Sequence, residues 1–176
     1  MRGHDWGPLQ ALSTDFTELI YRAHRKAWLM AVVDLDSRYV VGWGVAASRN
    51  RELALHVLDK VAATYDRLGQ SVQDVIIHHD KDSVYTSYAW LSEVLLRRGM
   101  QVSYSEHGAR HNPWVESLWS RLKLESRSRI AEAESVAELV AVCDEHFVYH
   151  NESRRHSALA NQSPIHYLQS QGIRSR

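Results

Sequence analysis

The first third of the chain is dominated by apolar runs of strand length. Residues 11–20 alternate weakly, whereas residues 28–35 and 39–47 are almost continuously apolar, as in a central strand. A compact polar tripeptide, Asp36-Ser37-Arg38, separates the last two runs and is typical of a hairpin turn. The pattern therefore predicts three adjacent antiparallel strands.

The middle of the chain changes to a helical period. Residues 50–68 carry one apolar stripe, followed by Gly69 as a helix C-cap. A short strand is predicted over residues 72–78 and a helix over residues 88–98, with Thr86 or Ser87 as its N-cap and Gly99 at its end. Residues 101–104 form a further predicted strand. The stripe comprises Leu53, Val57, Leu58, Val61, Tyr65 and Leu68.

The last third is predicted to be helical. In HNPWVESLWSRLKLE, residues 111–125, Asn112 is a favourable N-cap and Pro113 suits the first helical position. A long amphipathic helix is expected over residues 132–149, and Pro164 is expected to start a last short helix. Strands followed by alternating strands and helices indicate a mixed α/β fold. Three apolar positions, Val115, Leu118 and Leu122, give the first of these helices its core-facing side.

Composition supports one intracellular globular domain. With 176 residues, 44% of them hydrophobic, we expect a flexible segment at 1–10, a single domain at 11–170 and a tail at 171–176. One cysteine excludes an internal disulfide and a cysteine-based zinc site. No apolar run reaches membrane-spanning length, and the N-terminus does not resemble a signal peptide.

The charge balance argues against a simple basic DNA-binding module. Lys and Arg total 21 and Asp and Glu total 21, giving a formal net charge of zero. The balance is compatible with an acidic metal site. Residues 151–176 nevertheless hold four arginines and one glutamate, so the C-terminal end is locally basic.

Three carboxylates are candidates for a shared site. Asp15 lies in the first predicted strand, Asp80 follows the strand at 72–78, and Glu116 lies in the first turn of a helix. Taken one at a time, each has an ordinary explanation as a solvated side chain. A fourth acid, Asp34, is expected to bind turn N–H groups. Histidines are numerous, but no HExxH motif indicates a zinc site.

Five segments in order give these acids more weight: STDFTEL, AVVDLDSRYVVGWGV, HHDKDSVYTS, NPWVESLWSRLKLE and YHNESRRHSALANQSP. Together they resemble the catalytic core of DDE transposases and retroviral-type integrases, above all insertion-sequence transposases. The resemblance implies a ribonuclease-H-like fold, with a mixed five-stranded sheet flanked by helices. It also implies metal-dependent DNA strand cleavage and strand transfer.

The resemblance also implies roles for single residues. Asp15 would bridge two Mg²⁺ or Mn²⁺ ions, with Asp80 holding one ion and Glu116 the other. Lys123, seven residues after Glu116, matches a basic position that contacts DNA. Many relatives have a glycine where this chain has Asp82, whose negative charge would repel DNA unless it is turned away or helps to bind metal.

Further DNA contacts are expected from Asn112, Arg121, Arg154, Arg155 and His156. The last three form a basic group that could bind DNA phosphates or pair with acidic residues. The expected partners are DNA, both element ends and target, and at least a second copy of the chain. A location in the cytoplasm, on the nucleoid, follows from DNA binding.

Two other functions remain open at this level. A ribonuclease-H-like nuclease would use the same acids with water and would not join strands. A non-catalytic remnant would bind DNA or partner subunits only. No upstream helix-turn-helix region is recognised, so we expect either an excised core or a truncated gene product.

Overall fold

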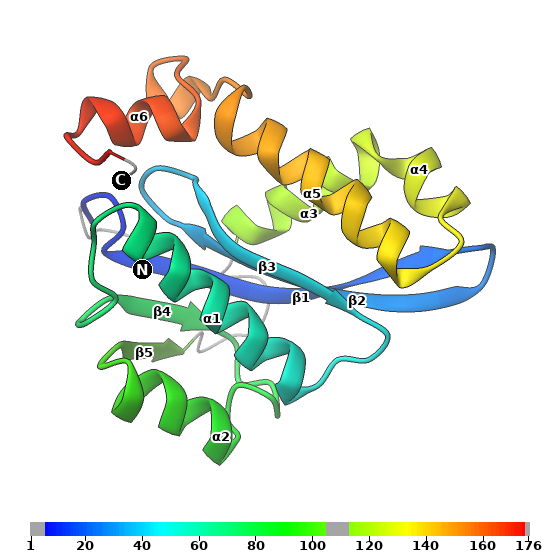
Figure 1. Cartoon of the computed structure of the whole chain (residues 1–176), viewed down its shortest axis with the longest axis horizontal. Coiled ribbons are helices and arrows are strands. Elements are labelled where there is room, and N and C mark those ends of the chain that lie inside the picture. The colour runs from blue at the N-terminus through cyan, green and yellow to red at the C-terminus, as the bar shows by residue number, and fades with distance from the viewer. Residues whose placement is uncertain (1–5, 105–112, 175–176) are drawn as a thin grey trace.

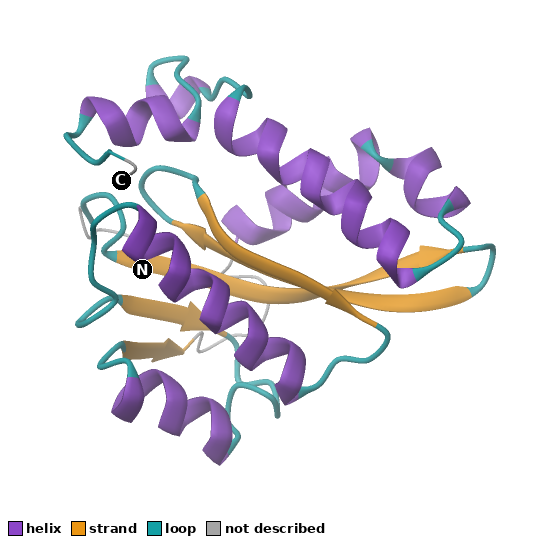
Figure 2. Ribbon diagram, in the orientation of Figure 1, coloured by secondary structure: helices purple, strands orange, loops and turns teal. Residues whose placement is uncertain are grey.

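A five-stranded mixed sheet lies at the centre of the molecule (Figures 1 and 2). The computed structural model describes residues 6–104 and 113–174. The strand order is β3-β2-β1-β4-β5. The pairs among the first three strands are antiparallel, and β4 and β5 continue the sheet in parallel with β1. The bounds are β1 Ala11–Tyr21, β2 Arg25–Asp34, β3 Val40–Ala46, β4 Ile76–His79 and β5 Gln101–Tyr104.

One face of the sheet is covered by α1 (Arg51–Arg67) and by α2 (Tyr88–Leu91), which continues as the π-helical η1 (Ser92–Arg97). The predicted apolar stripe of α1 is buried along its whole length. α1 approaches β3 closely because Gly42 lacks a side chain: a Cβ there would lie 2.8 Å from Cγ2 of Val61. Asn50 and Ser87 cap the two helices as N-cap residues.

The opposite face carries α3 (Pro113–Glu125), α4 (Arg127–Glu132) and α5 (Val136–Glu152), which Figure 1 shows together on one side of the sheet. α6 (Pro164–Ser170) follows the short 3-10 helix η3 (Ser157–Leu159). Val115, Leu118 and Leu122 are buried, as predicted for α3. This second helical layer places Glu116 above the sheet.

Two predicted elements have the wrong bounds. The strand predicted at 72–78 begins only at Ile76, because Asp74 adopts a left-handed conformation (φ 63°) that interrupts an extended chain. The helix predicted at 132–149 is α5, which begins only at Val136 and runs to Glu152. Its start is set by Ser135, whose side chain accepts a hydrogen bond from the Glu138 N–H and caps the helix there.

Asp34 has the structural role predicted for it. Its carboxylate is fully buried and accepts hydrogen bonds from the N–H groups of Leu9 and Ser37, at 3.0 and 2.8 Å, and from the Ser37 hydroxyl. Leu9 is only 3% exposed. The end of the 1–10 segment, which was predicted to be flexible, is therefore packed into the core. Within residues 6–104 and 113–174, no helix is both long and apolar enough to cross a membrane.

Candidate catalytic and metal-binding site

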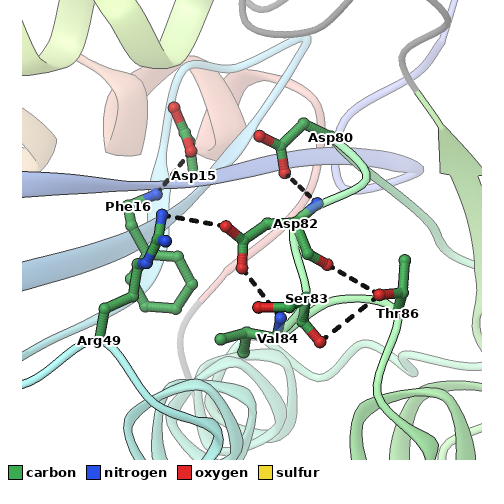
Figure 3. A network of polar contacts seen from close by, with 8 residues as sticks. All are labelled: Asp15, Phe16, Arg49, Asp80, Asp82, Ser83, Val84 and Thr86. Carbon is green, nitrogen blue, oxygen red and sulfur yellow. Dashed lines mark hydrogen bonds and ion pairs between the residues drawn. The ribbon is translucent and has the colours of Figure 1, made fainter.

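The sheet register brings Asp15 and Asp80 to matching positions on neighbouring strands. The parallel pairing of β1 with β4 ends at Ser13 and His78, and each aspartate lies two residues further along its chain. Side chains two residues apart on a strand share a face. Asp15 therefore belongs to the face that α3 covers, Asp80 follows the end of β4, and Figure 3 shows the two carboxylates projecting from adjacent backbone segments.

The Asp15 carboxylate lies in a strongly negative and half-buried environment. Its pKa is raised to about 6, chiefly by burial and also by repulsion from Asp80, Asp82 and Glu116. A 2.7 Å hydrogen bond from the Phe16 N–H acts in the opposite direction. Since three other carboxylates disfavour the ionised form of Asp15, a bound cation would stabilise it.

Asp80 is oriented by the backbone that follows it. Its Oδ1 accepts a 3.0 Å hydrogen bond from the Asp82 N–H, as Figure 3 shows. The Asp80 carbonyl oxygen accepts a hydrogen bond from Nδ1 of His79 at 2.8 Å. Nε2 of the same ring accepts a hydrogen bond from Nε1 of Trp90 at 3.2 Å, which fixes the proton on Nδ1.

A stack of aromatic rings links the backbones of the two aspartates from the α1 side of the sheet. Tyr85 is fully buried between His79, at 4.6 Å between ring centroids, and Phe16, at 5.3 Å. Its hydroxyl lies 3.4 Å from that of Thr14. The residues on both sides of Asp15 are thus tied to the residue before Asp80. The sequence analysis missed this arrangement.

Asp82 is neutralised by an arginine that the sequence analysis also missed. Its Oδ2 lies 3.0 Å from Nη1 of Arg49, and its Oδ1 accepts a hydrogen bond from the Val84 N–H at 2.9 Å (Figure 3). The Arg49 guanidinium lies over the Trp28 ring, 5.0 Å from its centroid. The carboxylate of Asp82 is therefore turned toward Arg49. Of the two possibilities considered for the charge of Asp82, it is the one in which the carboxylate is turned away that this contact favours.

Glu116 lies in the first turn of α3, next to buried Val115, with its own side chain exposed. It is close enough to act electrostatically on Asp15. Yet in the part of the chain that the structure describes, no group of three or more His, Cys, Asp or Glu side chains is arranged to hold a metal ion.

The donor set nevertheless fits a hard divalent ion. Asp15, Asp80 and Glu116 offer only carboxylate oxygens, which Mg²⁺ and Mn²⁺ prefer. Burial and the neighbouring acids raise the pKa of Asp15 to about 6, so a bound cation would stabilise its ionised form. The nearby histidines His78 and His79 are buried and turned to other partners, such as the Ser103 hydroxyl 3.1 Å from Nδ1 of His78. They lie at a strand end, as expected, but not on the surface.

The other DNA-binding candidates differ in their surroundings. Asn112 lies outside the described residues. Lys123 is exposed, and burial of its stem lowers its pKa, while the nearby Glu18 raises it. Arg121 and Arg155 are exposed, and neither makes an ion pair with any other described residue.

The three members of the predicted basic group, Arg154, Arg155 and His156, differ in charge and in partners. Arg154 pairs with Glu125, as in the second of the two predicted alternatives, and its side chain is only 14% exposed. His156 is not a cation at neutral pH. Burial and three arginines (Arg38, Arg121 and Arg154) lower its pKa to about 4. Only Arg155 keeps a free positive charge.

Comparisons with known proteins agree with this fold. A family model described as integrase core domain matches residues 6–109, and a second model of that description matches residues 98–164. The chain is 31% identical over 122 residues to transposase InsF for insertion sequence IS3A of Escherichia coli, covering 68% of this chain and 40% of InsF. It is 28% identical over 151 residues to a 31 kDa protein of insertion element IS600 from Shigella sonnei, covering 84% of this chain and 53% of that protein.

Solved structures give the same fold at low identity. The HTLV-2 integrase catalytic core domain in complex with magnesium superimposes with a TM-score of 0.61 and 14% identity, covering 91% of this chain and 96% of that chain. A chain of the simian T-cell lymphotropic virus intasome has a TM-score of 0.64 and 15% identity, covering 85% of this chain and 50% of that one. The fold is ribonuclease-H-like, as the sequence resemblance implied, and the chain belongs to the integrase core domain family.

Proposed function

We propose that this chain is the catalytic core of a DDE transposase, which cleaves a DNA strand at an element's end and joins its 3′-hydroxyl to target DNA. The single observation that carries the proposal is that three separate parts of the chain bring Asp15, Asp80 and Glu116 near one another: Asp15 and Asp80 follow the paired positions Ser13 and His78, and Glu116 is close enough to raise the pKa of Asp15. Because the chain spans about 40% of the length of InsF, the activity of the whole protein is part of this proposal.

Asp15, Asp80 and Glu116 would together hold two divalent ions, Mg²⁺ or Mn²⁺. Bound there, the ions would activate an attacking water or 3′-hydroxyl and stabilise the leaving oxygen. The magnesium in the HTLV-2 core supports this assignment by analogy of fold. The chain's own contribution is positional: β1 and β4 fix two acids in register, and α3 delivers the third.

DNA is the proposed partner. Phosphoryl transfer needs the reacting groups aligned, so side chains that hold the DNA backbone near the acids contribute directly to the rate. Lys123 is suited to this because it lies two turns after Glu116 on the same side of α3. A chain bound to DNA in a bacterial cell would lie on the nucleoid.

Assembly into a homodimer or a larger homo-oligomer is also proposed, since two DNA ends must be handled together. The HTLV-2 core has been solved in a trimeric and in a dimeric form. Relatives named as transposases favour joining over simple hydrolysis and favour catalysis over a remnant that only binds DNA.

The test uses the 176-residue chain, Mn²⁺ or Mg²⁺, and a labelled branched DNA that mimics a joined end. We expect the wild type to cleave the branch and reseal the remaining strand. We expect Glu116→Gln to do neither while still binding DNA. Glu132→Gln, which removes an exposed acid on α4, serves as the matched control and should remain active.

Each outcome distinguishes one function from the others. Joining by the wild type and the control alone supports the transferase. Cleavage without joining identifies a nuclease. Equal product from the wild type and Glu116→Gln would contradict the assignment of Glu116, and DNA binding without any product from the wild type would favour the remnant.

A further inference from the structure

A groove on the side of α3 away from Glu116 is lined by arginines and lacks acids. It has a volume of about 440 Å³ and lies between α3, the β2–β3 turn and the segment after α5. The charged residues of its lining are Arg38, Arg121 and Arg155, and the lining contains neither Asp nor Glu. Because the chain has no net charge, the positive charge of this groove comes from the local grouping of arginines and not from an overall basic composition.

The three arginines come from separate parts of the sequence and are held differently. The Arg38 guanidinium lies 3.5 Å from the centroid of the Trp114 ring and donates a hydrogen bond to the Leu35 carbonyl, so its position is fixed. Arg121 and Arg155 are exposed and make no ion pair with another described residue. The groove thus combines one preorganised cation with two that are available to an anion.

The carboxylates of Asp34 and Asp36 act on Arg38, whereas Arg121 and Arg155 make no ion pair with another described residue. Arg154, next in sequence to Arg155, is the member that pairs with Glu125. The positive field of Arg38 and Arg121 is also felt by His156, whose pKa it lowers. The imidazole therefore stays neutral at physiological pH and adds no charge of its own to the groove.

The position of the groove on α3 relates it to the proposed catalytic site. Trp114, Ser117 and Arg121 recur at helical spacing and line the groove. Glu116 and Lys123 occupy another side of the helix. A DNA duplex lying across α3 can therefore contact the metal-binding acids on one side of the helix and the arginines on the other.

We propose that this groove binds backbone phosphates of the DNA substrate, away from the reacting phosphate. The inference rests on the proposed function and deepens it. Arginine suits this task because its planar guanidinium donates two parallel hydrogen bonds to phosphate oxygens. Phosphate contacts of this kind hold the DNA in register without reading its sequence.

The test measures affinity of the 176-residue chain for a fluorescein-labelled DNA duplex by anisotropy, over a series of salt concentrations. Each lost phosphate contact reduces the slope of log K against log salt by roughly one. The double variant Arg121→Ala/Arg155→Ala should therefore lower the slope by about two and weaken binding at low salt. Arg121→Lys/Arg155→Lys should keep most of the slope.

The matched control removes two exposed arginines far from the groove, Arg25 at the start of β2 and Arg97 at the end of η1. Arg25→Ala/Arg97→Ala should bind DNA as the wild type does. A second variant, Ser117→Glu, places a carboxylate in the groove and should weaken binding with an unchanged melting temperature. If the double alanine variant and Ser117→Glu both match the control, the proposal is overturned.

Failure of this inference is distinguishable from failure of the proposed function. Joining of branched DNA by the groove variant should show a raised KM for DNA, whereas Glu116→Gln should lose kcat. If the groove variant binds DNA normally and Glu116→Gln still loses joining, the phosphate-binding role of the groove is rejected and the catalytic assignment stands. Joining by Glu116→Gln would remove the catalytic assignment whatever the groove variant does.

Discussion

Asp15 and Asp80 each lie two residues beyond Ser13 and His78, the last pair between the parallel strands β1 and β4, so β1 and the loop after β4 bring the two carboxylates near each other. The cost of this arrangement is visible in the pKa of Asp15, which burial and its acidic neighbours raise to about 6. Like charges held close without a counter-ion destabilise the fold that holds them. Stability and metal binding should therefore be linked at this position.

Asp15→Asn should stabilise the metal-free protein while abolishing strand joining. A folded-state pKa above the unfolded value of 3.8 means that the folded chain retains a proton that the unfolded chain releases. The free energy of unfolding of the wild type thus falls as pH rises from about 4 to about 6. In Asp15→Asn this decrease is absent, because the amide does not titrate. A shift of this size corresponds to about 3 kcal/mol at most.

Urea denaturation of both proteins in EDTA, at pH 4 and at pH 7.5, measures the effect. The gap in unfolding free energy should be small at pH 4 and largest at pH 7.5. Mn²⁺ should narrow it by stabilising the wild type alone. Asp66→Asn, at an exposed position on α1, provides the control, and an equal gain from that variant would disprove the link to the site.

Local sequence patterns predicted the helices and strands well where residues near an element's end determine where it begins or stops. Residues 101–104 form β5 as predicted, and Pro113 begins the helix that carries Glu116. The errors arose where one residue overrides its neighbours. Asp74 turns the chain in a run that is otherwise strand-like, and Ser135 starts α5 later than the amphipathic pattern predicts.

The acids of the site could be nominated from sequence only through resemblance, because a polar residue in a strand is ordinary. Their partners could not be predicted. Arg49 reaches Asp82 from the connection between β3 and α1, and Tyr85 stacks on Phe16 on the α1 side of the sheet. Such contacts depend on the packing of distant segments, which no local pattern encodes.

Asp82→Asn should distinguish the accessory acid from the proposed ligands. The amide oxygen can still accept the hydrogen bond from the Val84 N–H. The hydrogen bond from the backbone N–H of residue 82 to the Asp80 carboxylate is unchanged. Joining should stay within about tenfold of wild type, since no metal ligand is lost, and DNA binding should strengthen because Arg49 becomes free.

Asp80→Asn, assayed beside it, should lose joining by about 100-fold or more, which corresponds to about 2.7 kcal/mol of barrier. Single-turnover assays on branched DNA give both rates. Comparable losses in the two variants would instead make Asp82 part of the metal site.

His79→Phe should weaken both the fold and the positioning of Asp80. The ring can still stack on Tyr85, but the Trp90 N–H loses its acceptor and the Asp80 carbonyl loses its donor. Leaving buried polar groups unpaired costs about 1–3 kcal/mol. Denaturant unfolding should show this loss, and joining should require a higher Mg²⁺ concentration for half-maximal rate.

The Mg²⁺ requirement separates positioning from simple loss of fold, since the assay is run well below the melting temperature. His56→Phe, on the exposed side of α1, should change neither quantity. A destabilised His79→Phe protein with an unaltered Mg²⁺ requirement would show that the ring supports the fold but not the site.

The most direct measurement is metal rescue at Asp80. Asp80→Cys replaces a hard oxygen donor by a thiolate, which favours softer ions such as Cd²⁺ over Mg²⁺. If this carboxylate is a metal ligand of a strand-transfer site, the variant should fail to join branched DNA in Mg²⁺ and regain joining when Cd²⁺ is added, while Asp80→Ala regains none. Wild-type joining by Asp80→Cys in Mg²⁺ alone would contradict the account, because the site would then work without the carboxylate that β4 places beside Asp15.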